Sequence, residues 1–283
     1  MRKAFRILLA AFILSLCTSL YARNDWDKDV TISGVREIEE LNYELRNENG
    51  AAKSNLNLRI LTRYSKDGAK QETSWFNSDG SLNSKIVYHY DGLGNMIESL
   101  FYVFGMESTD RYQAQYDKRK QLSEYSGERI GGGLISRQKM EYDHKGRMTA
   151  TVTCDENDNV ASRVSYTYDS AGNCTSVDAF DMKGDSQYTL SNSYTSFGAI
   201  EDSVYRDAGG TVLYRTSYRY DEKGRMKEKA GYGKDGVTDY LWNYDWTDDG
   251  LMQESRLYRM GKGGTNELMA VSVYHAKKDT GNK

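Results

Sequence analysis

The chain has 283 residues and contains 26 glycines, 23 tyrosines and no proline. This composition excludes a proline-rich linker, a collagen and a leucine-rich helical bundle. It favours many strands joined by glycine turns, because tyrosine suits a half-buried pleated surface. The formal net charge is −3 and the pI is about 5.8, so the chain lacks the basic surface with which proteins bind nucleic acid.

The first 22 residues are predicted to form a signal peptide. A positive start with Arg2, Lys3 and Arg6 precedes an apolar run over 7–17, and the stretch ends in the small residue Ala22. This run is shorter than the ~20 apolar residues that span a bilayer, and the order of segments is typical of secretion. The sequence therefore predicts an exported protein that is periplasmic, outer-membrane-associated or extracellular, with no transmembrane span in the mature chain.

The chain contains three cysteines, which are considered for lipid attachment and for disulfide formation. Lipidation at Cys17 is disfavoured because the bulky Leu16 precedes it. Cys154 and Cys174 remain in the mature chain, which export brings into oxidising conditions. The strand order described below separates them by ~20 Å, beyond the ~7 Å between Cα atoms that a disulfide allows. Two free thiols are therefore predicted.

The segment after the signal peptide allows two interpretations. Apolar residues from Val35 to Leu45 fit the three- and four-residue spacing of a helix, whereas the alternation of Leu41, Tyr43 and Leu45 fits a strand paired with 56–64. The strand is favoured because the following residues already belong to a repeat. The chain is thus divided into a signal peptide, a leader with the first strand or strands, a repeat domain and a disordered tail, at 1–22, 23–55, 56–275 and 276–283.

A repeat of 26 residues runs through the domain at 56–275. Aromatic residues recur at this spacing, each at the end of a short stretch of alternating polarity. The series consists of Tyr64, Tyr90, Tyr116, Tyr142, Tyr168, Tyr194, Tyr220 and Trp246. Such a progression indicates a structural repeat, and each unit has room for two strands and two turns.

The turn that follows the aromatic residue has the pattern Y-D-x-x-G. The aspartate accepts hydrogen bonds from backbone N–H groups further along the turn, and the glycine adopts the positive φ that closes a hairpin with a bulge. Four units carry the full pattern, and their structural turn residues are Tyr90, Asp91 and Gly94; Tyr142, Asp143 and Gly146; Tyr168, Asp169 and Gly172; and Tyr220, Asp221 and Gly224.

Between the turns, bulky residues alternate with polar ones, as in half-buried strands. Counting in steps of two places the tyrosines on one face and polar residues such as His89 and Arg219 on the other. The same count places a column of carboxylates on the aromatic face, namely Glu72, Glu98, Glu124, Asp202, Glu228 and Glu254. Paired carboxylates beside aromatic residues are what glycoside hydrolysis requires, whereas a column copied with the repeat favours structural hydrogen bonds to tyrosine.

These Y-D-x-x-G units resemble the YD repeats of the Rhs family of secreted and surface proteins, over roughly 60–275. The resemblance implies a long β-sheet, which in Rhs proteins spirals into a shell around a carboxy-terminal toxin. Here the repeats continue almost to the end of the chain, and no toxin domain is expected. The chain looks more like the short YD-repeat proteins with signal peptides from Gram-negative bacteria of the gut type, for which carbohydrate binding is often proposed.

The predicted architecture is all-β, with about 17 strands in an up-and-down antiparallel meander. Twisted sheets of more than about ten strands curl, split or close, and a continuous aromatic face must be hidden from water. A curled or superhelical single sheet with an aromatic inner face is therefore expected. The alternative is a flatter sheet that hides this face in a dimer or on a partner.

The densest aromatic group consists of Tyr240, Trp242, Tyr244 and Trp246, which are candidates for ligand binding, although core packing is their favoured role. No nucleophile, nucleotide or metal motif accompanies them, so no catalytic residue, cofactor or metal is predicted. The sequence predicts an exported, non-enzymatic structural or binding module with a protein or cell-surface partner, a glycan included. The alternative is a glycan-active enzyme that uses the inward carboxylates.

Overall fold

The computed structural model describes residues 34–48, 51–105, 109–260 and 266–278. The predicted signal peptide at 1–22 and the segment at 23–33 lie outside the described residues. Both cysteines in the described part are free, with Cys154 buried and Cys174 half-buried, which confirms the predicted pair of thiols. Among the residues that the structure describes, no helix is long and apolar enough to cross a membrane.

The described chain forms eighteen antiparallel strands in sequence order. They are β1 (Val35–Glu48), β2 (Ala51–Tyr64), β3 (Lys70–Asn77), β4 (Leu82–Tyr90), β5 (Met96–Val103), β6 (Thr109–Tyr116), β7 (Leu122–Arg129), β8 (Leu134–Tyr142), β9 (Met148–Cys154), β10 (Val160–Tyr168), β11 (Cys174–Asp181), β12 (Ser186–Tyr194), β13 (Ile200–Asp207), β14 (Val212–Tyr220), β15 (Met226–Tyr232), β16 (Thr238–Trp246), β17 (Met252–Met260) and β18 (Asn266–Lys278). The all-β, up-and-down meander predicted from the repeat is therefore confirmed.

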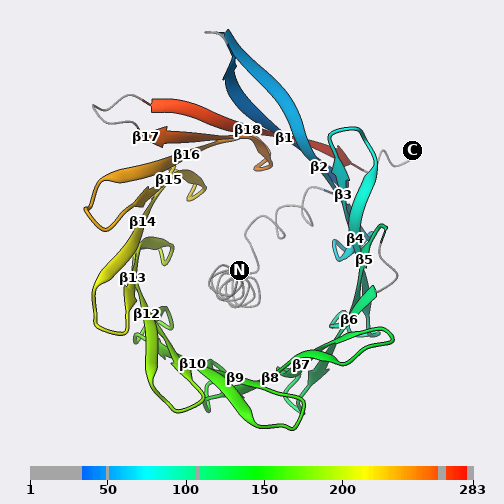
Figure 1. The fold of residues 1–283 in the computed structure, drawn as a ribbon, viewed down its shortest axis with the longest axis vertical. Coiled ribbons are helices and arrows are strands. Elements are labelled where there is room, and N and C mark those ends of the chain that lie inside the picture. Colours follow the sequence, from blue (N-terminus) through cyan, green and yellow to red (C-terminus); the bar gives the residue numbers. More distant parts are fainter. Residues whose placement is uncertain (1–33, 49–50, 106–108, 261–265, 279–283) are drawn as a thin grey trace.

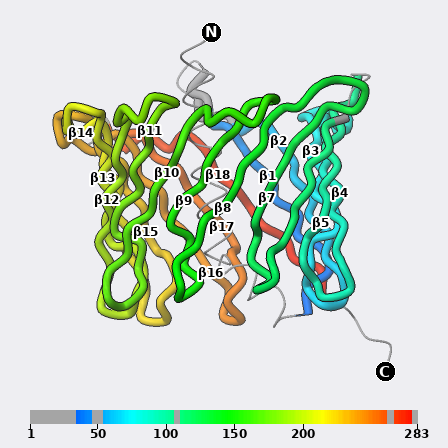
Figure 2. Tube along the Cα trace, turned by 90° about the horizontal axis from the view of Figure 1, so that it is seen from below, coloured from blue at the N-terminus to red at the C-terminus, as the bar shows by residue number. Residues whose placement is uncertain are grey.

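The sheet closes into a barrel because its first and last strands pair with each other (Figures 1 and 2). The pairing of β1 with β18 extends from Val35 opposite Lys278 to Glu44 opposite Ala270. The predicted curled sheet is wrong on this point, and so is the flatter sheet that was its alternative. Closure pairs the two edges that an open sheet leaves free, and it hides one face inside the molecule.

Both ends of the repeat region take part in the closure. The segment from Val35 to Glu48 forms β1, which pairs with β2 as in the strand interpretation. The disordered tail predicted for 276–283 is wrong for its first three residues, because β18 continues to Lys278. These residues are ordered by β1, with Ala276 opposite Ile38 and Lys277 opposite Glu37.

The Y-D-x-x-G turns are held by their aspartates. In the unit that starts at Tyr90, Asp91 Oδ1 accepts the backbone N–H groups of Leu93 at 2.8 Å and Asn95 at 2.9 Å. Asn95 Nδ2 donates to Asp91 Oδ2 at 2.9 Å, and these bonds hold the pKa of Asp91 below its usual range. Gly94 has a φ of +84°, which residues with a side chain adopt only with strain. The residue after the glycine is thus a partner of the aspartate, which explains why Asn or Arg occupies it.

A β-bulge follows each of these turns and changes the face of the outgoing strand. His89 pairs with Glu98, whereas Tyr90 pairs with Met96, so Ile97 is an extra residue. The same shift occurs beside each of the eight repeated aromatic residues. Since side chains alternate along a strand, one extra residue turns the rest of the strand over.

The bulge overturns the predicted position of the carboxylate column. Glu98 lies beside His89, and Ser99 instead takes the place opposite Tyr88 on the aromatic face. Leu100 and Tyr102, which the parity count assigned to the aromatic face, also lie on the opposite one. A count in steps of two fails here because it treats each hairpin as free of bulges.

The face that carries the repeated tyrosines is the inner face of the barrel. Residues of the five neighbouring strands β18, β1, β2, β3 and β4 line one recess on this face. Side chains of five neighbouring strands converge in this way on the concave side of a curved wall, which is the inside of the barrel. Burial raises the pKa of Tyr125 and Tyr244 to about 12. On the outer face, by contrast, the Arg219 side chain is 76% exposed.

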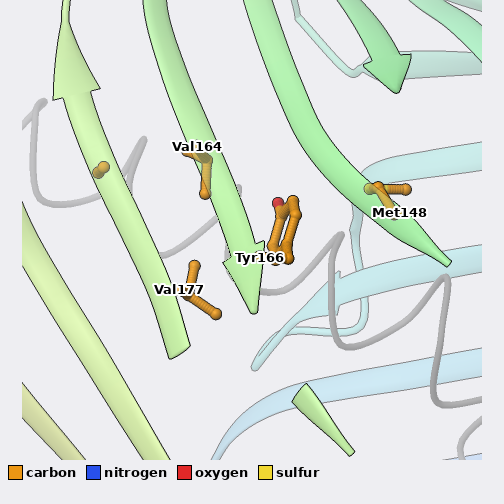
Figure 3. Close-up of a cluster of buried hydrophobic side chains, with 5 residues drawn as sticks. Met148, Val164, Tyr166 and Val177 are labelled. Atoms are coloured by element: carbon orange, nitrogen blue, oxygen red, sulfur yellow. The ribbon is translucent and has the colours of Figure 1, made fainter. Parts of the chain in front are cut away.

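The inner face also contains a cluster of buried apolar side chains. Met148, Val164, Tyr166 and Val177 lie together on β9, β10 and β11 (Figure 3), and each is less than 10% exposed. Thr151 lies beside them and shares a hydrogen bond of 3.3 Å with the Tyr166 hydroxyl. Each such side chain stabilises the fold by ~1.5–3 kcal/mol when fully buried.

Candidate binding site inside the barrel

A ladder of aromatic donors ties neighbouring strands together along the inner face. The hydroxyl of Tyr168 donates a hydrogen bond of 2.7 Å to the carbonyl of Met148, which begins the preceding strand. Trp246 makes the same bond to Met226 through its indole N–H, also at 2.7 Å. The other bonds of the ladder join Tyr90 to Lys70, Tyr116 to Met96, Tyr142 to Leu122, Tyr194 to Cys174 and Tyr220 to Ile200. These side chains are structural, and tryptophan replaces tyrosine because it too has a donor at its far edge.

The recess of the inner face lies where the barrel closes, and it has a volume of about 320 Å³. Its lining includes the aromatic residues Trp75, Tyr88 and Tyr274 and the acidic residue Glu40. Aromatic rings offer flat stacking surfaces, and a few polar groups among them fix the orientation of a ligand. The sequence did not indicate this site, because its walls come from both ends of the chain.

Glu40 is the carboxylate that the recess contains. Tyr274 donates a hydrogen bond of 3.4 Å to Glu40 Oε1. Burial raises the pKa of Glu40, and hydrogen bonds from Asn42 and Tyr274 oppose this shift only in part. Glycoside hydrolysis uses a pair of carboxyl groups ~5–10 Å apart. Among the residues that the structure describes, the lining of the recess includes one carboxylate residue, Glu40, together with Lys70.

The predicted aromatic patch of β16 lies on the inner face, but its members have different roles. Trp246 belongs to the ladder. Tyr240 and Trp242 lie with their ring centroids 5.9 Å apart, and Lys229 Nζ is 5.1 Å from the centre of the Trp242 ring. Tyr240, Trp242 and Tyr244 therefore remain candidates for contact with a ligand.

The carboxylate column lies on the outer face in ion pairs. Glu98 accepts a hydrogen bond from His89 at 2.8 Å and lies 3.2 Å from Arg111. The pairs at the other positions join Glu72 to Arg63, Glu124 to Arg137, Asp202 to Arg215, Glu228 to Arg219 and Glu254 to Arg256. The alternative hypothesis of a glycan-active enzyme relied on these carboxylates facing inward, and they face outward.

The described residues contain no group of three or more His, Cys, Asp and Glu side chains that could hold a metal ion. The turn aspartates are occupied by backbone N–H groups and by the side chain after the glycine, as in Asp143, which binds Arg147 at 2.7 Å. The position of these aspartates is explained by their hydrogen bonds within the turns.

No protein-family model and no curated protein matches this chain. The chain is similar in structure to a porin-like protein from Bacteroides uniformis, with 9% identity, 86% of this chain and 98% of that chain covered, and a TM-score of 0.46. A porin-like protein from Bacteroides vulgatus has 10% identity, the same coverage and a TM-score of 0.37. The structure of TcdB2-TccC3 has 11% identity and a TM-score of 0.31, and the match covers 77% of this chain but 15% of that one.

The predicted membership of the YD-repeat family is wrong. No family model supports it, and the chain closes into an eighteen-stranded barrel instead of a spiralling shell. The sequence motif that suggested the family is explained by the local geometry of the turn, since aspartate, glycine and the following Asn or Arg each have a role within a single hairpin.

Proposed function

We propose that the protein is an exported, non-enzymatic binding module that holds an oligosaccharide against the inner face of its barrel. The observation that carries the proposal is the recess at the closure, whose lining combines Trp75, Tyr88 and Tyr274 with Glu40 and two threonines. Sugars present apolar ring faces and hydroxyl edges, and aromatic rings beside polar groups complement both.

The outer face supports placing this barrel in water. Barrels of the outer membrane carry an apolar band towards the lipid, and charged residues near the middle of that band are destabilising. Here the outer face carries ion pairs within the strands, including Arg163 with Glu141 at 2.7 Å and Arg215 with Asp202 at 2.7 Å. We therefore place the barrel in the periplasm, at a membrane surface or outside the cell.

The test is a glycan array followed by calorimetry on the purified protein. We expect Trp75→Ala to lower the affinity for the bound glycan at least tenfold, because loss of a stacking ring removes ~1–2 kcal/mol or more. Tyr102→Ala is the matched control, since Tyr102 is an aromatic residue on the outer face beside Lys85. Both variants should retain the circular dichroism spectrum of the barrel.

Three results would overturn the proposal. They are an array without any bound glycan, equal binding by Trp75→Ala and the unaltered protein, and hydrolysis of the bound glycan. The last result would establish an enzyme, and the variant Glu40→Gln would then show whether the recess is its active site.

A further inference from the structure

Lys229 is a cation on the inner face without a counter-ion among the described residues. It lies on β15 between Tyr218 of β14 and Trp242 of β16, and each of these neighbours is its direct cross-strand partner. Its ammonium group contacts the Trp242 ring, with Nζ 5.1 Å from the ring centre. In the part of the chain that the structure describes, no hydrogen bond or ion pair reaches this group.

Lys85 on the outer face provides a comparison, because it has the acidic partner that Lys229 lacks among the described residues. Lys85 lies over an aromatic ring as well, with Nζ 5.3 Å from the centre of the Tyr102 ring. It differs in having an acidic partner, since Nζ is 3.5 Å from Glu72. The two lysines thus share a ring contact, and only the outer one has its charge balanced.

Burial makes this arrangement unfavourable for the protein alone. It lowers the pKa of Lys229, and no carboxylate acts in the opposite direction. A neutral long side chain would cover the Trp242 ring without this penalty. The neighbouring phenols have pKa values raised by burial, that of Tyr244 to about 12, and so they remain protonated donors at neutral pH.

We propose that Lys229, with the phenols of Tyr218 and Tyr244, forms a subsite for the anionic group of an acidic oligosaccharide. Trp242 provides the surface on which the sugar ring stacks. The ligand brings the missing negative charge, and the two phenols complete its hydrogen bonds. This inference rests on the proposed function and narrows its ligand to glycans that carry carboxylate or sulfate groups.

The subsite is continuous with the recess. Tyr244 of β16 pairs with Ser255 of β17, which pairs with Ser272 of β18, and Tyr274 of the recess lies two residues further along β18 on the same face. From Lys229 on β15 to Glu40 on β1 the wall extends over four strand spacings, or ~19 Å. One oligosaccharide can therefore reach from Glu40 to Lys229, with its anionic group at the lysine and a neutral ring at the recess.

The experiment is calorimetry with three oligosaccharides of equal length, one neutral, one composed of uronic acids and one sulfated. We expect the unaltered protein to prefer an acidic ligand, and the stronger of the two identifies its anion. Lys229→Met should lower the affinity for that ligand at least tenfold, because a charged hydrogen bond is lost, and should leave the neutral ligand unaffected. Lys229→Arg should retain the preference for the acidic ligand. Lys85→Met should change the affinity for neither the acidic nor the neutral ligand.

Equal affinity of the unaltered protein for neutral and acidic ligands would overturn the subsite and leave the proposed function standing. An acidic preference that survives Lys229→Met would do the same. If none of the three ligands binds, and the array contains no other, the proposed function fails and the subsite fails with it.

Discussion

The inner and outer faces of the barrel use the same strands and the same turns, yet different interactions hold them. On the inner face, tyrosine hydroxyls such as that of Tyr168 bond to backbone carbonyls at about 2.7 Å, and the rings pack over apolar side chains. On the outer face, carboxylates such as Glu228 form ion pairs with arginines. Exposed ion pairs contribute at most ~1 kcal/mol each. The side-chain contribution to the stability of the barrel therefore comes mainly from its inner face.

The bulge beside each repeated aromatic residue separates the two sets of side chains. Without it, Glu98 would lie opposite Tyr88 on the inner face, where burial of an unpaired carboxylate is costly. With it, the carboxylate meets His89 and Arg111 outside. The extra residue after each repeated aromatic residue thus decides which face receives each side chain of the outgoing strand. The following predictions test this difference between the faces.

The largest effect is expected for the ladder on the inner face. Tyr168→Ala should lower the free energy of unfolding by ~3 kcal/mol or more, since it removes a packed ring and leaves a cavity. Tyr168→Phe keeps the ring and removes only the hydrogen bond to Met148, and should cost ~1 kcal/mol. Urea denaturation measures both values. A Phe variant as stable as the unaltered protein would show that the ladder bond contributes nothing.

A smaller loss of stability is expected for a substitution in the turn that precedes the bulge. Gly94→Ala should cost ~1–2 kcal/mol, because φ at this position is +84°. Gly92 in the same turn has an ordinary φ and open space around it, so Gly92→Ala is the matched control and should change stability little. Thermal unfolding of the two variants is the measurement. Equal midpoints would contradict the strained turn.

The buried carboxylate of the inner face should produce a dependence on pH. Its raised pKa means that the folded state binds the proton more tightly than the unfolded chain, so Glu40 destabilises the fold as the pH rises through that pKa. Glu40→Gln should therefore raise the thermal midpoint at pH 7. The gain should vanish below the ordinary value of 4.5, where both states are protonated. Glu39→Gln, on the outer face beside Arg59, should show no such gain, and a gain for Glu40→Gln that is independent of pH would refute this account.

The smallest effect is expected on the outer face. Glu228→Gln removes the charge that lies 3.4 Å from Arg219, whose side chain is 76% exposed. The free energy of unfolding should change by less than about 1 kcal/mol, and added salt should reduce the difference further. Denaturation at two salt concentrations measures it. A loss as large as that of Tyr168→Ala would show that Glu228 is buried.

The sequence was informative where the interactions are local. The turn pattern around Asp91 and Gly94 predicts hairpins because each of its residues acts within a few positions of the others. Closure was not predictable in this way. β1 and β18 pair although more than 200 residues separate them in the sequence, and neither strand contains a motif that identifies the other as its partner. The recess followed from that closure, since Glu40 and Tyr274 come from these two strands.

The faces were predicted correctly for the residues that lead directly into each repeated aromatic residue, such as Ile86 and Tyr88, and wrongly for the residues that follow it. A bulge adds a residue without changing the composition of the strand, so the alternation of Met96, Leu100 and Tyr102 still resembles an unbroken series. The count failed at Ile97, which is 40% exposed. The polar residues that alternate with this series, such as Ser99, are short because the tyrosine rings of the inner face cover them.

Thiol accessibility at two adjacent positions tests the separation of the faces most directly. In a background in which Cys154 and Cys174 are replaced by serine, Glu98→Cys and Ser99→Cys would each be treated with a charged, thiol-specific reagent. The bulge predicts rapid modification at position 98, and modification at least tenfold slower at position 99, where Ser99 is 6% exposed. Rapid reaction at 99 and protection at 98 would place the carboxylates inside the barrel and contradict the account.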